Sequence, residues 1–158
     1  MTAPPQDSAG TSLTEDRPLG DEGRRSLQAY IAGLTVPMKV ELASKGNREV
    51  RSILSRDAST MVARAVMQSP KISEQDVLSY VASAKTHEEI LRAIAESRQW
   101  TANRQVVTAL VLNPRTPPPV SVRFLRTFQT NELRVLMLNR GLSVAVRQEA
   151  RRLLAQRH

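Results

Sequence analysis

An apolar pattern of helical period runs almost without interruption from Pro37 to the end of the chain and constrains the fold more than any other feature. Apolar residues recur three and four positions apart, which is the spacing that lines one face of an α-helix. Leu110 and Leu153 are expected to be core positions. Further positions expected on the apolar faces include Val50, Ile53, Leu54, Met61, Val62, Ala65, Val66, Leu133, Val135, Leu136 and Leu138. No stretch alternates apolar and polar residues as a half-buried strand would. The pattern therefore predicts an all-α protein.

Start and stop signals divide this pattern into segments of roughly 8–13 residues. Ser69-Pro70 and Asn113-Pro114 end helices, because proline cannot continue a helix and restricts the residue before it. Thr86 is expected to cap a helix in a capping box with Glu89, and Thr116 to cap another. These signals predict about nine helices with short loops. Two of the expected helix starts stay open, at Asp57 or Ser59 and at Thr101 or Asn103. The expected segments are 38–43, 47–54, 57 or 59 to 66, 73–82, 86–95, 101 or 103 to 111, 116–128, 130–138 and 143–154, with a further short segment at Ser26–Gly33.

Residues 1–25 have a different composition from the rest of the chain. Met1–Gly23 contains three prolines, three glycines and five acidic residues, but only two leucines. Such a segment buries too little apolar surface to offset the conformational entropy that it loses on ordering. The composition predicts a disordered tail over residues 1–25, followed by a folded domain over residues 26–156.

Two parts of the helical region resemble each other. Ala65–Lys71 aligns with Ala109–Arg115, and in each an apolar helix ends at a small polar residue, a proline and a basic residue. Pro70 and Pro114 are 44 positions apart. This is about the length of one HEAT or armadillo repeat, or of two shorter repeats.

Val146–Leu154 resembles the Val-Arg-x-x-Ala-x-x-x-Leu pattern found on the second helix of HEAT repeats. Partial copies occur at Val50-Arg51 and Val122-Arg123, and the spacing of Asp57, Val62 and Arg64 resembles the turn between HEAT helices. Residues 36–156 therefore resemble a HEAT-like helical-repeat protein, and the chain is also similar to small uncharacterised bacterial helical-repeat proteins. The resemblance implies a short right-handed α-solenoid of stacked antiparallel helix pairs, whose curved surface binds peptides, helices or other proteins.

The sequence contains no recognisable catalytic chemistry. It has no cysteine and two histidines, of which His87 has no second histidine or glutamate at helical ligand spacing and His158 is the last residue. No Gly-x-Ser-x-Gly motif and no phosphate-binding glycine loop is present. We therefore expect a protein that is not an enzyme, with no metal, no cofactor and no small-molecule substrate.

Two further features favour structural roles. Trp100 lies at a junction between two expected helices, which favours a buried joint over a binding hot spot. Pro117-Pro118-Pro119 precedes an apolar-faced helix, which favours a rigid helix entry over a ligand for a proline-reading module.

Charge is the one candidate signal of function. Residues 1–91 have a net charge of −1, whereas residues 92–158 contain 12 arginines, no lysine and 3 glutamates, a net charge of +9. Residues three or four apart share a helical face. Arg123 is therefore expected on the same face as Arg126, and Arg147 on the same face as Arg151. The candidate partner-binding residues are Arg115, Arg123, Arg126, Arg134, Arg147 and Arg151.

These arginines favour an adaptor or scaffold that binds a protein, in particular an acidic segment, on the second half of the chain. The alternative is a nucleic-acid-binding module that uses the same arginines on phosphates. An aromatic content of 3% argues against stacking on single-stranded bases. A solvated basic surface with no partner remains open as the third interpretation.

No signal peptide and no membrane span is expected, because the sequence has no apolar run of about 18 residues and no apolar stretch near its first residue. The absence of cysteine fits a reducing compartment. We therefore expect a cytoplasmic protein.

Overall fold

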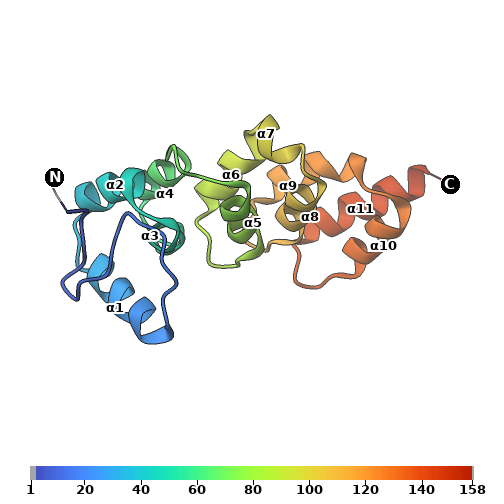
Figure 1. Ribbon diagram of the computed structural model, residues 1–158. Coiled ribbons are helices and arrows are strands. Elements are labelled where there is room, and N and C mark those ends of the chain that lie inside the picture. Colours follow the sequence, from blue (N-terminus) through green and yellow to red (C-terminus); the bar gives the residue numbers. More distant parts are fainter. Residues whose placement is uncertain (1–2, 158) are drawn as a thin grey trace. The chain divides into compact units, whose positions relative to one another are not determined.

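The computed structural model describes residues 3–157, and within that range the chain forms helices and no strand beyond one isolated bridge between Gln6 and Ser12. The predicted all-α class is thus confirmed. The helices are α1 (Asp21–Ala32), α2 (Val36–Lys45), α3 (Arg48–Leu54), α4 (Thr60–Met67), α5 (Glu74–Ala82), α6 (Glu88–Glu96), α7 (Arg98–Thr101), α8 (Arg104–Leu112), α9 (Pro118–Phe124), the 3-10 helix η1 (Leu125–Thr127), α10 (Thr130–Leu138) and α11 (Val144–Gln156) (Figure 1).

The described chain thus has eleven α-helices where the pattern suggested about nine. Nine of them fall on the nine expected segments. Of the other two, α7 is a single turn around Trp100, too short to show a period of its own. The other, α1, begins at Asp21, ahead of the expected segment Ser26–Gly33, because Asp21 and Glu22 supply acidic residues that favour a first turn.

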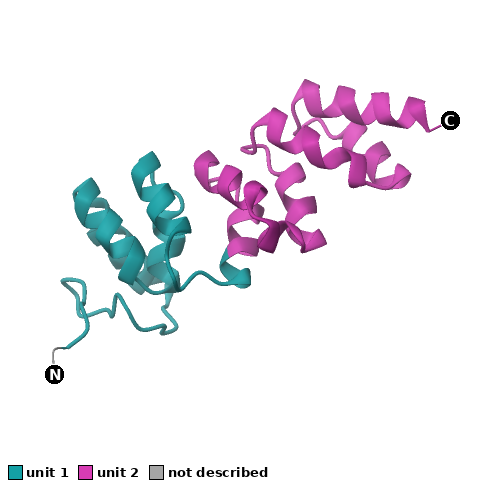
Figure 2. Ribbon diagram, turned by 90° about the horizontal axis from the view of Figure 1, so that it is seen from above, with its two compact units in different colours: residues 1–76 teal, residues 77–158 magenta. Residues whose placement is uncertain are grey.

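The helices form two compact units, one ending at Asp76 and one beginning at Val77 (Figure 2). The boundary lies inside α5. The sequence pattern treated residues 26–156 as one domain, since apolar periodicity reports which face of a helix is buried and not which helices it is buried against. We describe each unit by itself.

Unit 1 is held by apolar residues on the facing sides of its helices. Helix α2 packs against α3 and α4, and α1 packs against α3. Of the apolar positions predicted for the second and third segments, Val50, Leu54, Val62 and Val66 are buried and Ile53 and Ala65 are half-buried. The prediction is wrong for Met61, which is 64% exposed. The buried side chains of these helices include Leu27, Ile31, Ala43, Val50, Leu54, Val62, Ala63 and Val66.

Residues 3–20 lie against the helices of unit 1 through specific contacts. The Leu13 side chain is 3% exposed, and the backbone N–H of Asn47 donates to the Leu13 carbonyl at 2.7 Å. The Asn47 side-chain amide also donates to the carbonyls of Ser12 at 3.0 Å and Glu15 at 2.9 Å. Over residues 3–25 the structure therefore differs from the disordered tail expected over residues 1–25, of which residues 1 and 2 lie outside the described residues. Composition averages over a segment, whereas one buried leucine and a few backbone hydrogen bonds hold this one.

Four helices, α4, α5, α8 and α10, end in the same hydrogen-bonded turn. Its first residue is Ser69, Ser83, Asn113 or Asn139. In each turn that residue's N–H donates to the carbonyl three positions before it, and its own carbonyl accepts from the N–H three positions after it. Its side-chain oxygen accepts from the N–H two positions after it, at 2.8–3.3 Å. The likeness between the two proline-containing stretches thus reflects a shared turn, which also occurs twice without proline.

Two predicted helix caps are wrong by one residue. Thr86 and Thr116 each donate their hydroxyl backwards, to the carbonyls of Tyr80 at 2.6 Å and Leu110 at 2.7 Å. Each hydroxyl therefore closes the preceding turn instead of capping the next helix. The cap of α6 is His87, whose Nδ1 accepts from the Glu89 N–H at 3.0 Å, and that of α9 is Pro117.

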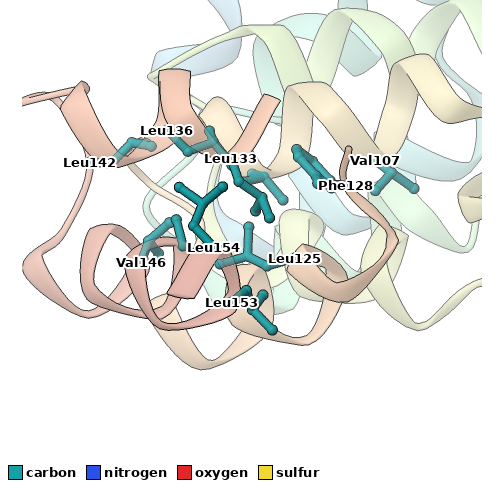
Figure 3. Close-up of a cluster of buried hydrophobic side chains, with 11 residues drawn as sticks. Val107, Leu125, Phe128, Leu133, Leu136, Leu142, Val146, Leu153 and Leu154 are labelled. Carbon is teal, nitrogen blue, oxygen red and sulfur yellow. The ribbon is translucent and has the colours of Figure 1, made fainter. Parts of the chain in front are cut away.

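The C-terminal part of unit 2 has a continuous apolar core. Helices α10 and α11 pack along each other, and α9 and η1 pack against α11. Figure 3 shows Leu125, Leu133 and Leu154 pointing toward one another inside this cluster. Leu110 and Leu153, both predicted core positions, are buried. The cluster consists of Val107, Val111, Leu125, Phe128, Leu133, Leu136, Leu142, Val146, Ala150, Leu153 and Leu154.

Candidate functional site

The two units differ in charge. Residues 1–76 contain 10 basic and 10 acidic residues, whereas residues 77–158 contain 13 basic and 5 acidic residues, a net charge of +8. Five carboxylates cannot provide each of thirteen cations with a partner of its own. Unit 2 therefore presents excess positive charge to solvent.

Five of the six candidate arginines are exposed, and none of the five has a described carboxylate oxygen within 4.0 Å. They are Arg115 in the turn after α8, Arg123 in α9, Arg126 in η1, Arg134 in α10 and Arg151 in α11.

The sixth candidate, Arg147, is half-buried on α11. Its Nε is fully buried and has no hydrogen-bond partner in the described structure. Its position in the Val-Arg pattern therefore puts part of the side chain into the protein and not onto a binding surface.

The structure does not gather the six arginines into one cluster. Consecutive helical residues are 100° apart, so Arg147 and Arg151 lie on one side of the buried stripe of α11 and Glu149 lies on the other. Arg126 is on the Glu149 side. The Arg152 hydrogen bond lowers the pKa of the Glu149 carboxyl most, and the positive charge of Arg126 lowers it further. The basic residues thus border α11 on both sides.

Three arginines of unit 2 that are not among the six candidates form hydrogen bonds with neighbouring groups. Arg152 binds Glu149 with two hydrogen bonds of 2.8 and 2.5 Å. Arg157 donates to the Arg126 carbonyl at 3.4 Å. The i,i+3 spacing of Glu149 and Arg152 was a usable sequence signal, whereas Arg157 has no such signal.

Arg104, the third, holds a corner between α8 and α10. Its guanidinium lies 4.3 Å from the centre of the Phe128 ring and donates to Glu132 Oε2 at 2.8 Å. It also donates to Thr127 Oγ1 at 2.9 Å. Because these partners lie more than 20 positions away in the sequence, local spacing could not predict the contact.

A groove of about 240 Å³ lies beside this corner, between α8 and α10. Most of its surface is apolar. The buried side chains of Phe128 and Leu136 form its floor, and the exposed side chains of Leu112 and Val135 form its rim. The lining residues are Thr108, Leu112, Phe128, Asn131, Glu132, Val135 and Leu136.

The apolar residues of α10 divide between the core and solvent. Leu133 and Leu136 are buried, but Val135 is 65% and Leu138 74% exposed. The sequence placed all four among the apolar positions of this helix. Only two fit the stripe that α11 covers. Of the other two, Val135 lines the groove and Leu138 lies one turn further along the helix.

The residues singled out for structural roles lie as follows. Trp100 is half-buried within α7, and Pro118 and Pro119 form the first turn of α9. Among residues 3–157 no group of three or more metal-ligating side chains comes together, and no helix is long and apolar enough to cross a membrane.

Comparison of the chain with protein-family models, with curated proteins and with solved structures found no significant match. A function therefore has to be inferred from the geometry and charge of unit 2.

Proposed function

We propose that this chain is a non-enzymatic adaptor that binds a protein partner through the basic surface of unit 2. The observation that carries the proposal is the set of exposed arginines without carboxylate partners, on a unit with a net charge of +8. Arginine pairs with carboxylate through two parallel hydrogen bonds, so an acidic segment of another protein is the complementary partner.

The proposal includes a HEAT-like architecture, a short right-handed α-solenoid of stacked helix pairs. The repeated turn supports it, since a repeat protein reuses one connection between successive helices. The Asn113 side-chain amide donates to the carbonyls of Val81 at 2.8 Å and Ser83 at 2.9 Å. This links the turn after α8 to the end of α5, as neighbouring repeats are linked in a stack.

The second candidate is a nucleic-acid-binding module, favoured by the same exposed arginines. Phosphate neutralisation by arginine would make its affinity fall steeply with salt. The described surface of unit 2 offers few aromatic platforms for bases, because Phe128 is buried under Arg104. We therefore place the protein partner first. We propose the cytoplasm as its compartment, in keeping with a chain without cysteine.

The test is charge reversal on unit 2 with a matched control on unit 1. Arg126→Glu with Arg151→Glu changes two exposed arginines, and the control Arg25→Glu with Arg56→Glu makes the same change in net charge. Each protein is used to capture partners from a lysate at physiological salt, with and without nuclease. Circular dichroism verifies that each variant is folded.

We expect the unit 2 variant to lose nuclease-resistant partners that the wild type and the control both retain. Equal capture by all three proteins would contradict the proposal. Loss of every partner after nuclease treatment would favour the nucleic-acid module instead.

A further inference from the structure

The groove between α8 and α10 has the form of a receptor for another helix. Resting on the proposed adaptor function, we propose that this groove is where the partner docks, and that the docked segment is an acidic amphipathic helix. Four observations lead to this inference: the apolar lining, the exposed apolar rim, the spacing of the lining residues and the surrounding charge.

The lining offers a place for apolar side chains. Phe128 and Leu136 form its floor from within the core, and Leu112 and Val135 stand at its rim, 42% and 65% exposed. Leu138, one turn beyond Val135 on α10, is 74% exposed and continues the apolar surface. A monomer gains nothing from exposing neighbouring large apolar side chains, so a contiguous patch of them marks a contact surface.

The spacing of the lining residues favours a helix as the occupant. Thr108 and Leu112 are four apart on α8, and Asn131 and Val135 are four apart on α10. Leu138, outside the lining, follows Val135 by three positions on the same side of α10. The groove thus has two walls, each a ridge of one helix. A third helix lies in such a groove with apolar residues at positions i, i+3, i+4 and i+7.

Charge around the groove selects an acidic helix. Arg134 is exposed on the same side of α10 as Asn131 and Leu138, and has no described carboxylate partner. Glu132, the one carboxylate in the lining, is paired with Arg104. A second copy of this chain would bring another unit of net charge +8 to the groove, and like charges oppose that contact.

The test uses three fluorescent peptides of roughly 16 residues, long enough to form a helix on binding. The first has leucines at i, i+3, i+4 and i+7 with glutamates on the other face. The second has the same composition in scrambled order, and the third replaces glutamate by lysine. Binding is followed by fluorescence anisotropy at physiological salt.

Val135→Glu is the decisive variant, and Val144→Glu is its control. Both valines are exposed, both lie in unit 2 and both substitutions change the charge equally, but Val144 lies outside the groove lining. We expect the acidic amphipathic peptide to bind the wild type and Val144→Glu alike, and Val135→Glu at least about tenfold more weakly. The scrambled and lysine peptides should bind weakly to all three proteins.

Three results would overturn the inference. Equal affinity for Val135→Glu and Val144→Glu would mean that the peptide does not occupy the groove. If Arg126→Glu with Arg151→Glu then abolished binding, the adaptor surface would stand and the groove would fail. Equal binding of the lysine peptide would remove the charge argument. A wild-type dimer in light scattering that dissociates in Val135→Glu would assign the groove to a second copy.

Discussion

Units 1 and 2 use their charged residues in different ways. Unit 1 has equal numbers of basic and acidic residues and buries one ion pair, whereas unit 2 has 13 basic and 5 acidic residues around an apolar core. In unit 1, charge contributes to holding the chain together. In unit 2, most of it faces outward, which is why we place partner binding there.

The buried pair of unit 1 has several hydrogen bonds, although the Arg51 Nε has no described partner. Arg51 donates to Asp76 Oδ2 at 2.8 Å and to the Gly46 carbonyl at 3.0 Å, and Asp76 Oδ2 also accepts from the Ser73 N–H at 3.0 Å. The two side chains are 4% and 2% exposed. A buried charge is tolerated only with such partners, because its desolvation is otherwise uncompensated.

Arg147 occupies the same Val-Arg position on α11 that Arg51 occupies on α3, but it has no described carboxylate partner. The Nε atoms of both arginines are buried without a described hydrogen-bond partner. The same sequence pattern therefore marks an arginine with a buried carboxylate partner in one unit and an arginine without a described carboxylate partner in the other. The difference lies in what the rest of each unit provides: unit 1 has Asp76 within reach, and unit 2 has few carboxylates.

The largest expected effect comes from opening the buried pair. Asp76→Ala leaves Arg51 charged and buried, and should lower the free energy of unfolding by about 3–5 kcal/mol. The control is Glu41→Ala, which breaks the exposed pair with Lys45 and should cost less than about 0.5 kcal/mol. Urea denaturation measures both. Equal losses would show that burial does not distinguish the two pairs.

The core of unit 2 should respond next most strongly. Leu133→Ala opens a cavity in the buried cluster and should cost about 2–5 kcal/mol. Leu138→Ala, on the same helix but exposed, should change stability by less than about 0.5 kcal/mol. Denaturation midpoints give the comparison. A large loss for Leu138→Ala would mean that this residue is covered, and would weaken the case for an open groove.

The helices were predictable because apolar spacing and stop signals are local. Val50, Leu110 and Leu153 were assigned to the core correctly, since each lies on an apolar stripe that recurs every three or four residues. Val135 and Leu138 show the limit of that rule. An apolar residue fits a stripe in sequence, but only packing against α11 decides whether it is covered.

The site was less predictable than the fold. Excess arginine in residues 92–158 was visible in the sequence, but the contact of Arg104 with Phe128 and Glu132 joins residues far apart in the chain. The groove depends on how α8 and α10 meet, which no local spacing encodes. The ordered contacts of Leu13 were missed for the same reason: its partners lie more than 30 positions later.

Removing the Leu13 contact tests whether residues 3–20 stabilise the helices of unit 1. Leu13→Ala should cost about 1–3 kcal/mol, less than a central core leucine, because the segment can detach without unfolding the helices. Arg17→Ala, in the same segment but exposed, is the control and should have almost no effect. Thermal denaturation of both variants and of a chain lacking residues 1–20 decides the matter. An unchanged midpoint in the truncated chain would favour the disordered tail predicted from composition.

The smallest expected effect concerns Glu149, the acidic residue of unit 2 that lies between Arg152 and Arg126. The Arg152 hydrogen bond, with smaller contributions from the charges of Arg152 and Arg126, lowers the pKa of the Glu149 carboxyl. A carboxyl whose pKa is lowered by folding stabilises the protein above its unfolded pKa of about 4.3, and that contribution is lost as the pH falls through the folded value.

Arg126→Glu replaces a positive charge near Glu149 with a negative one, so the pKa of Glu149 should rise, and the loss of its stabilising contribution should begin at a higher pH. Arg123→Glu, one turn away with no described interaction with Glu149, should leave that pKa nearly unchanged. NMR titration of the Glu149 side-chain carboxyl measures both variants. Because this pair is largely exposed and screened by solvent, its effect on stability should be smaller than that of Asp76→Ala, Leu133→Ala or Leu13→Ala. A shift as large in Arg123→Glu as in Arg126→Glu would mean that Glu149 senses the whole charge of unit 2 and not the arginine beside it. The outward charge of this unit would then act as a diffuse field, and the exposed arginines would lose their claim to a defined binding surface.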